Sequence, residues 1–257
     1  MRIRTFVAIG AGLAMLSGAS FAQAMKPDDN PATRAKGKQI YERACLFCHG
    51  AEGKGDGPAG WFIGRYESPR PRNFTGESFK FRSTPSGELP TDQDLFRTVT
   101  QGIPSNMPPF SGLSEEERWQ VIAYVKTFNQ AFKGGKPTAL SLPNPPGPSS
   151  DAGIENGRQV YIKYGCQKCH GDNGYGDGKE FLDDNLKDAS GLTISPGDLT
   201  ERASLKSGSS AQALYRSIMT GLDGTPMPSY ADTIGGKDSD VWDLVYYILS
   251  LSNDRRW

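Results

Sequence analysis

The feature that most constrains this chain is an internal repeat, because landmarks of the first half recur in the same order about 120 residues later. The segment GKQIY at 37–41 matches GRQVY at 157–161, and the cluster CLFCH at 45–49 matches CQKCH at 166–170. Such an ordered series is typical of a duplicated structural unit. We therefore predict two tandem domains, at 25–132 and 153–257. The segment 133–152 is rich in Pro, Gly and Ser and is predicted to be the linker.

Residues 1–24 have the pattern of an export signal. Arg2 and Arg4 precede a short apolar run at 6–19, and the small residues at 22–24 suit a signal peptidase. The run is too short to span the roughly 30 Å of bilayer hydrocarbon. We predict cleavage after Ala24, a mature protein that starts at Met25 without a transmembrane segment, and a periplasmic location.

Both copies predict helices joined by long loops, and no segment shows convincing strand alternation, so the expected fold class is all-α. In the first copy the signals predict a helix from Pro31 to the Cys cluster, a short helix from the Thr91–Asp94 capping box to Gly102, and a helix at Glu115–Gln130 that is capped by Ser114. In the second copy they predict helices at Ser210–Gly221 and at about Asp240–Ser252.

The first and last helices of each copy are expected to approach closely at Gly37 and Gly157. Beside these glycines stand Tyr41 and Tyr161, and the matching aromatic residues of the last helices are Trp119, Tyr124, Trp242 and Tyr246. These residues are therefore expected to have structural rather than catalytic roles.

The two clusters contain all four Cys and both His of the chain. The pattern C-x-x-C-H is the attachment signature of c-type haem. Two thiols on one helical turn can each bond a haem vinyl group, and the next residue then directs its imidazole at the iron. A thioredoxin-like pair would leave the histidine unexplained, a zinc site would need four ligands, and a disulfide would close too small a loop to stabilise much. Two covalently bound haem c groups are therefore expected, attached at Cys45, Cys48, Cys166 and Cys169.

The sixth ligand of each iron must come from another residue type, because the only two histidines of the chain already serve as the proximal ligands. Methionine suits haem iron and raises its reduction potential. Met107 follows His49 by 58 positions, Met227 follows His170 by 57, and each precedes a proline. We predict these four residues as the axial ligands. Met219 falls inside a predicted helix and is expected to serve packing.

With a C-x-x-C-H helix, a downstream Met-Pro loop and an aromatic C-terminal helix, each half resembles a class I cytochrome c domain. The whole mature chain resembles the bacterial di-haem cytochromes c, which are electron carriers of the cell envelope. The resemblance implies the same thioether cysteines, proximal histidines and distal methionines. The stretches 61–90 and 179–209 are longer than a compact domain of this kind needs.

Electron transfer between redox partner proteins is the leading functional hypothesis, since two six-coordinate haems leave no position for substrate. The alternatives are a cytochrome subunit of a larger dehydrogenase or reductase complex and a di-haem peroxidase. A peroxidase needs a vacant or displaceable iron ligand and usually a distal histidine or acidic group, and the chain has no third histidine. Nucleic acid is not an expected partner, because Lys+Arg and Asp+Glu are equal at 29 each.

The charge differs between the copies. Residues 25–132 have 14 basic and 13 acidic side chains, whereas residues 153–257 have 11 basic and 15 acidic ones. The first copy's basic side chains include Arg65, Arg70, Arg72, Lys80 and Arg82. The contrast predicts that the first domain docks an acidic surface and the second a basic one.

Overall fold

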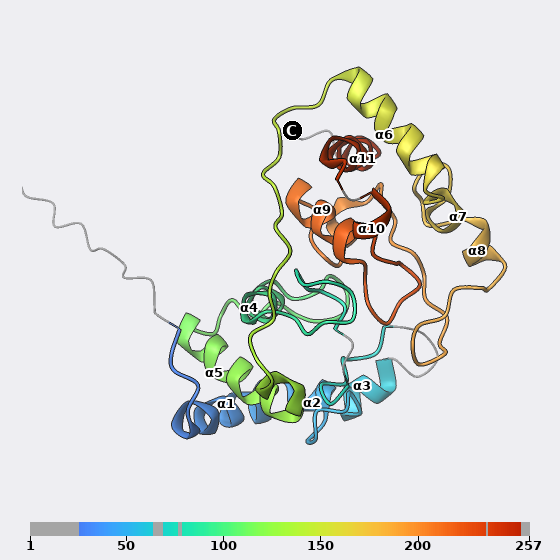
Figure 1. The fold of residues 1–257 in the computed structure, drawn as a ribbon. Helices are drawn as coiled ribbons and strands as arrows, with labels where there is room; N and C mark the ends of the chain where they lie inside the picture. Colours follow the sequence, from blue (N-terminus) through green and yellow to red (C-terminus); the bar gives the residue numbers. More distant parts are fainter. Residues whose placement is uncertain (1–25, 64–68, 77–78, 235, 253–257) are drawn as a thin grey trace, which may run out of the picture.

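The computed structural model describes residues 26–63, 69–76, 79–234 and 236–252 (Figure 1). The predicted signal peptide at 1–24 lies outside these residues. The described residues form helices and long loops without a β-strand, and two isolated bridges, Ile103 with Met107 and Lys187 with Thr193, are their only β-type pairing. The predicted all-α class is confirmed.

The first half contains five α-helices among the described residues, followed by two 3₁₀ segments. They are α1 (Pro31–Ala44), α2 (Leu46–His49), α3 (Pro58–Ile63), α4 (Asp92–Gln101), α5 (Glu115–Val125), η1 (Lys126–Phe128) and η2 (Gln130–Lys133). The Asn30 side chain accepts from the Thr33 amide and caps α1, and both predicted capping boxes form at α4 and α5.

The prediction of one α-helix over Glu115–Gln130 is wrong at its C-terminal end. The α-helix stops at Val125, and Asn129 adopts an extended conformation with φ −125° and ψ 116°. The Asn129 side chain accepts from the Ala131 amide and donates to the Gly76 carbonyl. These side-chain bonds compete with helical hydrogen bonding and divert the chain into a second short turn.

The second half repeats the arrangement with α6 (Asp151–Lys163), α7 (Gln167–His170), α8 (Lys179–Leu182), η3 (Arg202–Ser204), α9 (Ala211–Thr220), α10 (Ala231–Ile234) and α11 (Asp238–Ser250). The last helix starts and ends two residues earlier than predicted. Its first turn uses the Lys237 carbonyl, which accepts from the Val241 amide, and its last turn tightens where Leu251 donates to Ile248.

Each half is built on a crossing of its first and last long helices, α1 on α5 and α6 on α11. A Cβ at Gly37 would clash with the Gln120 carbonyl, and one at Gly157 would clash with the Asp243 carbonyl. The predicted close approach of the two helices at these glycines is therefore confirmed.

Trp119, Tyr124 and Trp242 take the structural positions expected of them, but the prediction of Tyr246 as the partner of Tyr161 is wrong by one residue. Tyr247 lies beside Gly157 and Tyr161, whereas the Tyr246 ring is tilted against Trp242 and its hydroxyl donates to the Gly147 carbonyl. Tyr41 and Tyr161 are each 1% exposed, and Trp119 and Trp242 are each 4% exposed. Edge-to-face ring contacts link Tyr41 with Tyr124 in the first half, and Tyr161 with Tyr247 in the second.

Residues 134–150 contain no helix and connect the two halves along one side of the molecule (Figure 1). The Leu140 amide donates to the Ser83 carbonyl at 2.8 Å, and the Tyr246 hydroxyl donates to the Gly147 carbonyl. The connection is thus fixed to both halves. Among the described residues, no helix combines the length and apolar character needed to cross a bilayer.

Candidate functional site

The two C-x-x-C-H clusters begin where the first helix of each half ends. In the first half the Cys45 amide donates to the Tyr41 carbonyl at 2.9 Å, as in a continuing helix. In the second half Cys166 donates to Tyr161 at 3.0 Å across one more residue, and Gly165 takes a positive φ of 73°. This single inserted residue explains why the repeat offset changes from 120 to 121.

Glycine turns return the chain across each histidine. The Gly55 amide donates to the His49 carbonyl at 2.9 Å, and Gly176 donates to His170 at the same distance. The residue that follows, Asp56 or Asp177, lies beside Gly50 or Gly171, where a Cβ would clash with its carboxylate. The glycine-rich runs therefore form compact turns that fold back onto the backbone of each histidine.

The imidazoles are oriented through their Nδ1 atoms. His49 Nδ1 lies 3.1 Å from the Arg72 carbonyl, and His170 Nδ1 lies 3.0 Å from the Gly197 carbonyl. A carbonyl only accepts hydrogen bonds, so Nδ1 must hold the proton and Nε2 must present its lone pair. Burial lowers the pKa of both histidines, which favours this neutral, ligating form.

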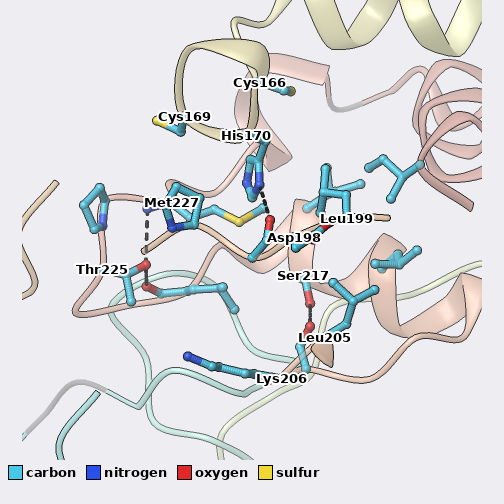
Figure 2. Close-up of a pocket in the computed structure, with 18 of the residues that line it drawn as sticks. Cys166, Cys169, His170, Asp198, Leu199, Leu205, Lys206, Ser217, Thr225 and Met227 are labelled. Carbon is cyan, nitrogen blue, oxygen red and sulfur yellow. Dashed lines mark hydrogen bonds between the residues drawn. The ribbon is translucent and has the colours of Figure 1, made fainter. Parts of the chain in front are cut away.

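A cavity of about 370 Å³ opens in front of His170. It is lined by Cys166, Cys169, His170 and Met227 together with many apolar side chains. Figure 2 shows the His170 ring and the Met227 thioether pointing into the same space, with the two cysteines at one end. The predicted site residues of the second domain thus meet at one cavity.

The first half has a matching cavity of about 200 Å³, lined by Cys45, Cys48, His49 and Met107. None of the four cysteines is paired in a disulfide, so all four are available for attachment to a prosthetic group. Thiols at one end, a neutral imidazole, a facing thioether and apolar walls fit a covalently attached haem.

Each methionine sits in a short loop that follows a glycine helix stop. In the first half Gly102 ends α4, and Ile103 and Met107 exchange backbone hydrogen bonds of 2.8 and 2.9 Å. In the second half Gly221 ends α9, and Leu222 donates to the Met227 carbonyl at 3.1 Å. Hydrogen bonding within the loop fixes where each methionine side chain leaves the backbone.

Met219 occupies a different position from Met227. It lies within α9 and packs against the apolar core of the second half, and it is absent from the residues that line the cavity. Its backbone carbonyl accepts from the Ser229 hydroxyl at 2.6 Å. The structure therefore separates the two candidate methionines of this half as the repeat predicts.

Three of the basic side chains named for docking do not lie on an open surface. Arg82 is only 1% exposed, and Arg72 and Lys80 line cavities. Composition suggests surface charge here, but it does not reveal that Arg82, Ser86 and Gly87 contact the second half. Arg65 lies outside the described residues. Of the four others named for docking, Arg70 alone is exposed, although it too borders the first cavity.

Two family models match the chain. The model described as cytochrome C oxidase, cbb3-type, subunit III matches residues 32–125, and the model described as cytochrome c matches residues 154–252. Among the curated proteins searched, no sequence matches this chain.

A solved structure is also similar, a chain of the Kuenenia stuttgartiensis reducing HAO-like protein complex Kustc0457/Kustc0458. The two chains are 40% identical with a TM-score of 0.77, and the match covers 84% of this chain and 96% of that one. The duplicated helical fold, the paired thiol and imidazole cavities and these matches lead to one conclusion. This chain belongs to the cytochrome c family and consists of two c-type domains in tandem, each with one covalently bound haem c.

Proposed function

We propose that the protein is a periplasmic di-haem cytochrome c that passes electrons between redox partner proteins through two haems with His/Met ligation. The axial ligand pairs are His49 with Met107 and His170 with Met227. The observation that supports this best is that each cavity is lined by one histidine and one methionine of its own domain. The proposed domains are 25–132 and 153–257, after a signal peptide at 1–24.

Haem iron supplies a one-electron redox couple, and the chain's residues determine its environment. The cysteines attach the ring, and the carbonyls of Arg72 and Gly197 hold the two imidazoles in the tautomer that ligates. The apolar cavity walls exclude water. A methionine sulfur as distal ligand favours the reduced iron and raises the potential.

Six-coordinate iron argues against peroxidase activity, because peroxide would find no open position. A second candidate, a cytochrome subunit of an oxidoreductase complex, is favoured by the 40% identity to a chain of a solved protein complex. Stable co-purification with a catalytic subunit would support this candidate over a free carrier, and isolation as a single chain from the native membrane-free extract would argue against it.

A redox titration of the purified mature protein with visible spectra tests the proposal. We expect two haems per chain, both low-spin, with a methionine–iron charge-transfer band in the oxidised state. A high-spin haem, or turnover of peroxide by the purified protein, would contradict it. Fractionation of cells tests the location separately, and the proposal requires the protein in the periplasmic fraction.

A further inference from the structure

The two haem cavities share three lining residues. Lys80 and Phe81 of the first domain and Lys206 of the second line both cavities. We call these three residues the shared wall. Each domain therefore contributes side chains to the cavity of the other, and the two cavities meet at this wall.

The shared wall is positively charged. Lys80 and Lys206 are the only Lys or Arg side chains that line the second cavity among the described residues, and in the first cavity they join Arg70 and Arg72. Within the part of the chain that the structure describes, neither lysine forms an ion pair or a hydrogen bond.

This arrangement is unfavourable for the protein alone. Burial, together with repulsion from Arg72 and Lys206, lowers the pKa of Lys80 to about 8, and Asp188 offsets the effect only in part. Burial also lowers the pKa of Lys206. Partly buried ammonium groups that are only partly compensated by a carboxylate cost free energy, so the site favours an anion.

The lysines occupy equivalent places in the two copies. Each follows a buried apolar residue, Phe79 with 6% and Leu205 with 7% exposure, shortly after the backbone segment that contacts the histidine. The duplication therefore supplies the same cation twice, and the packing of the domains brings both copies to one place.

The chemistry of the porphyrin supplies the matching anion. A haem has its two vinyl groups on one edge and its two propionate carboxylates on the opposite edge. The cysteines fix the vinyl edge, and Figure 2 shows Lys206 at the end of the second cavity opposite to Cys166 and Cys169. A haem attached at these cysteines would therefore present its propionate edge to the shared wall.

We propose that Lys80 and Lys206 form a cation pair, common to both cavities, that binds propionate groups of both haems and couples the two haems electrostatically. A positive charge near a haem favours the ferrous over the ferric state, since oxidation adds positive charge. A lysine shared by two haems must therefore affect both reduction potentials. The inference depends on the two covalent haems and not on methionine ligation, so it can fail while the proposed ligation stands.

The test is Lys80→Met in the full holoprotein, with both midpoint potentials measured by spectroelectrochemical titration. We expect both potentials to fall, and Lys206→Met to produce the same double shift. Lys36→Met is the matched control, because Lys36 is exposed on α1 and lines neither cavity, and it should leave both potentials unchanged. Lys80→Arg keeps the charge and should retain most of both potentials.

A shift of one potential only would overturn the sharing, and an absence of shift in either variant would overturn the propionate contact. If Lys80→Met does not assemble with two haems, Lys206→Met decides alone, because the proposal requires both potentials to fall in that variant too. Retention of the methionine–iron band in these variants distinguishes this outcome from a failure of the ligation proposal.

Discussion

The two domains keep the same hydrogen bonds around the haem but pack different side chains behind them. Tyr41 donates to the Gly50 carbonyl at 2.7 Å, and Tyr161 donates to Gly171 at 2.6 Å. The imidazole bonds differ by only 0.1 Å between the copies. The comparison shows that backbone geometry at the haem is the conserved part of the duplication, whereas core composition is free to vary.

The packing contrast is clearest beside the histidines. In the first domain the Phe74 ring stacks on His49 with centroids 4.4 Å apart, and Phe128 continues the aromatic group. Leu199 takes the place of Phe74 in the second domain, and Leu251 lies beside its glycine turn. The second domain compensates with a larger continuous cluster of buried apolar residues.

The domains also differ at their interface. Leu95 of α4 lies 15 positions after Lys80, but Leu214 of α9 lies only 8 after Lys206. The extra segment of the first domain contains Arg82, which donates to the Thr220 carbonyl at 2.6 Å and pairs with Asp223 at 2.7 Å. Arg82 of the first domain thus fixes the start of the second domain's loop that leads to Met227.

The largest expected effect tests what the domains share. Gly37→Ala and Gly157→Ala should each destabilise the protein by about 4 kcal/mol, because each added Cβ would collide with a backbone carbonyl of the partner helix. Urea unfolding monitored by circular dichroism measures both. Gly112→Ala serves as the control, because a Cβ at Gly112 would have no atom within 4 Å. Clearly unequal losses of unfolding free energy in the two variants would show that the two helix crossings are not equivalent.

The next effect tests the asymmetric interface. Arg82→Met should cost about 3 kcal/mol, since it removes a buried ion pair and leaves the Thr220 carbonyl without its donor. It should also disturb the methionine–iron band of the second haem more than that of the first. Arg43→Met removes an exposed pair with Glu117 and should cost less than about 1 kcal/mol. Equal losses of unfolding free energy in Arg82→Met and Arg43→Met would show that the buried ion pair at the interface stabilises the protein no more than an exposed one.

Asp94 provides a test by pH, because α9 has Ala213 at the equivalent position. Burial alone would raise the pKa of Asp94, but hydrogen bonds from Ser83 and the charge of Arg97 hold it below the usual 3.8. A lowered folded-state pKa means that this carboxylate stabilises the protein at neutral pH and that the stabilisation is lost as the pH falls through that pKa.

Asp94→Asn should therefore cost about 2 kcal/mol at pH 7 and much less in acid. Unfolding free energies at neutral and acidic pH give the comparison, and Asp92→Asn, at a more exposed pair, is the matched variant. The same loss at both pH values would contradict the assignment of the charge.

The smallest effect concerns the ring beside the first histidine. Phe74→Leu reproduces the side chain of the second domain and should cost about 1 kcal/mol, because the stacking on His49 is lost while most apolar burial is kept. Thermal unfolding measures the change. A loss as large as that of Arg82→Met would mean that the first domain depends on its aromatic group far more than the second depends on Leu199.

The sequence predicted much of the fold because the relevant signals are local. The capping boxes at Thr91 and Ser114 locate two helix starts within one turn. The glycines at equivalent positions, Gly37 and Gly157, indicate a close crossing of two helices. The end of α5 was missed because Asn129 leaves the helix through a bond to Gly76, a residue distant in sequence.

The gathering of the site residues in each cavity follows from the repeat, but the shared wall does not. Lys80, Lys206 and Arg82 lie in stretches without periodicity, and their positions depend on how two domains pack together. A pattern search within one domain contains no information on that packing. Arg82 was therefore named for docking although it lies at the interface between the domains, whereas docking of the first domain to an acidic partner stays a prediction.

The central claim, one His/Met haem in each domain, is tested most directly by the methionine–iron charge-transfer band in three variants of the holoprotein. Met107→Ala and Met227→Ala should each remove about half of the band and lower one of the two potentials, with both haems still attached. Met219→Ala should keep the whole band and cost only packing stability, because Met219 lies outside the cavity. Loss of band intensity in Met219→Ala, with an intact band in Met227→Ala, would contradict the account.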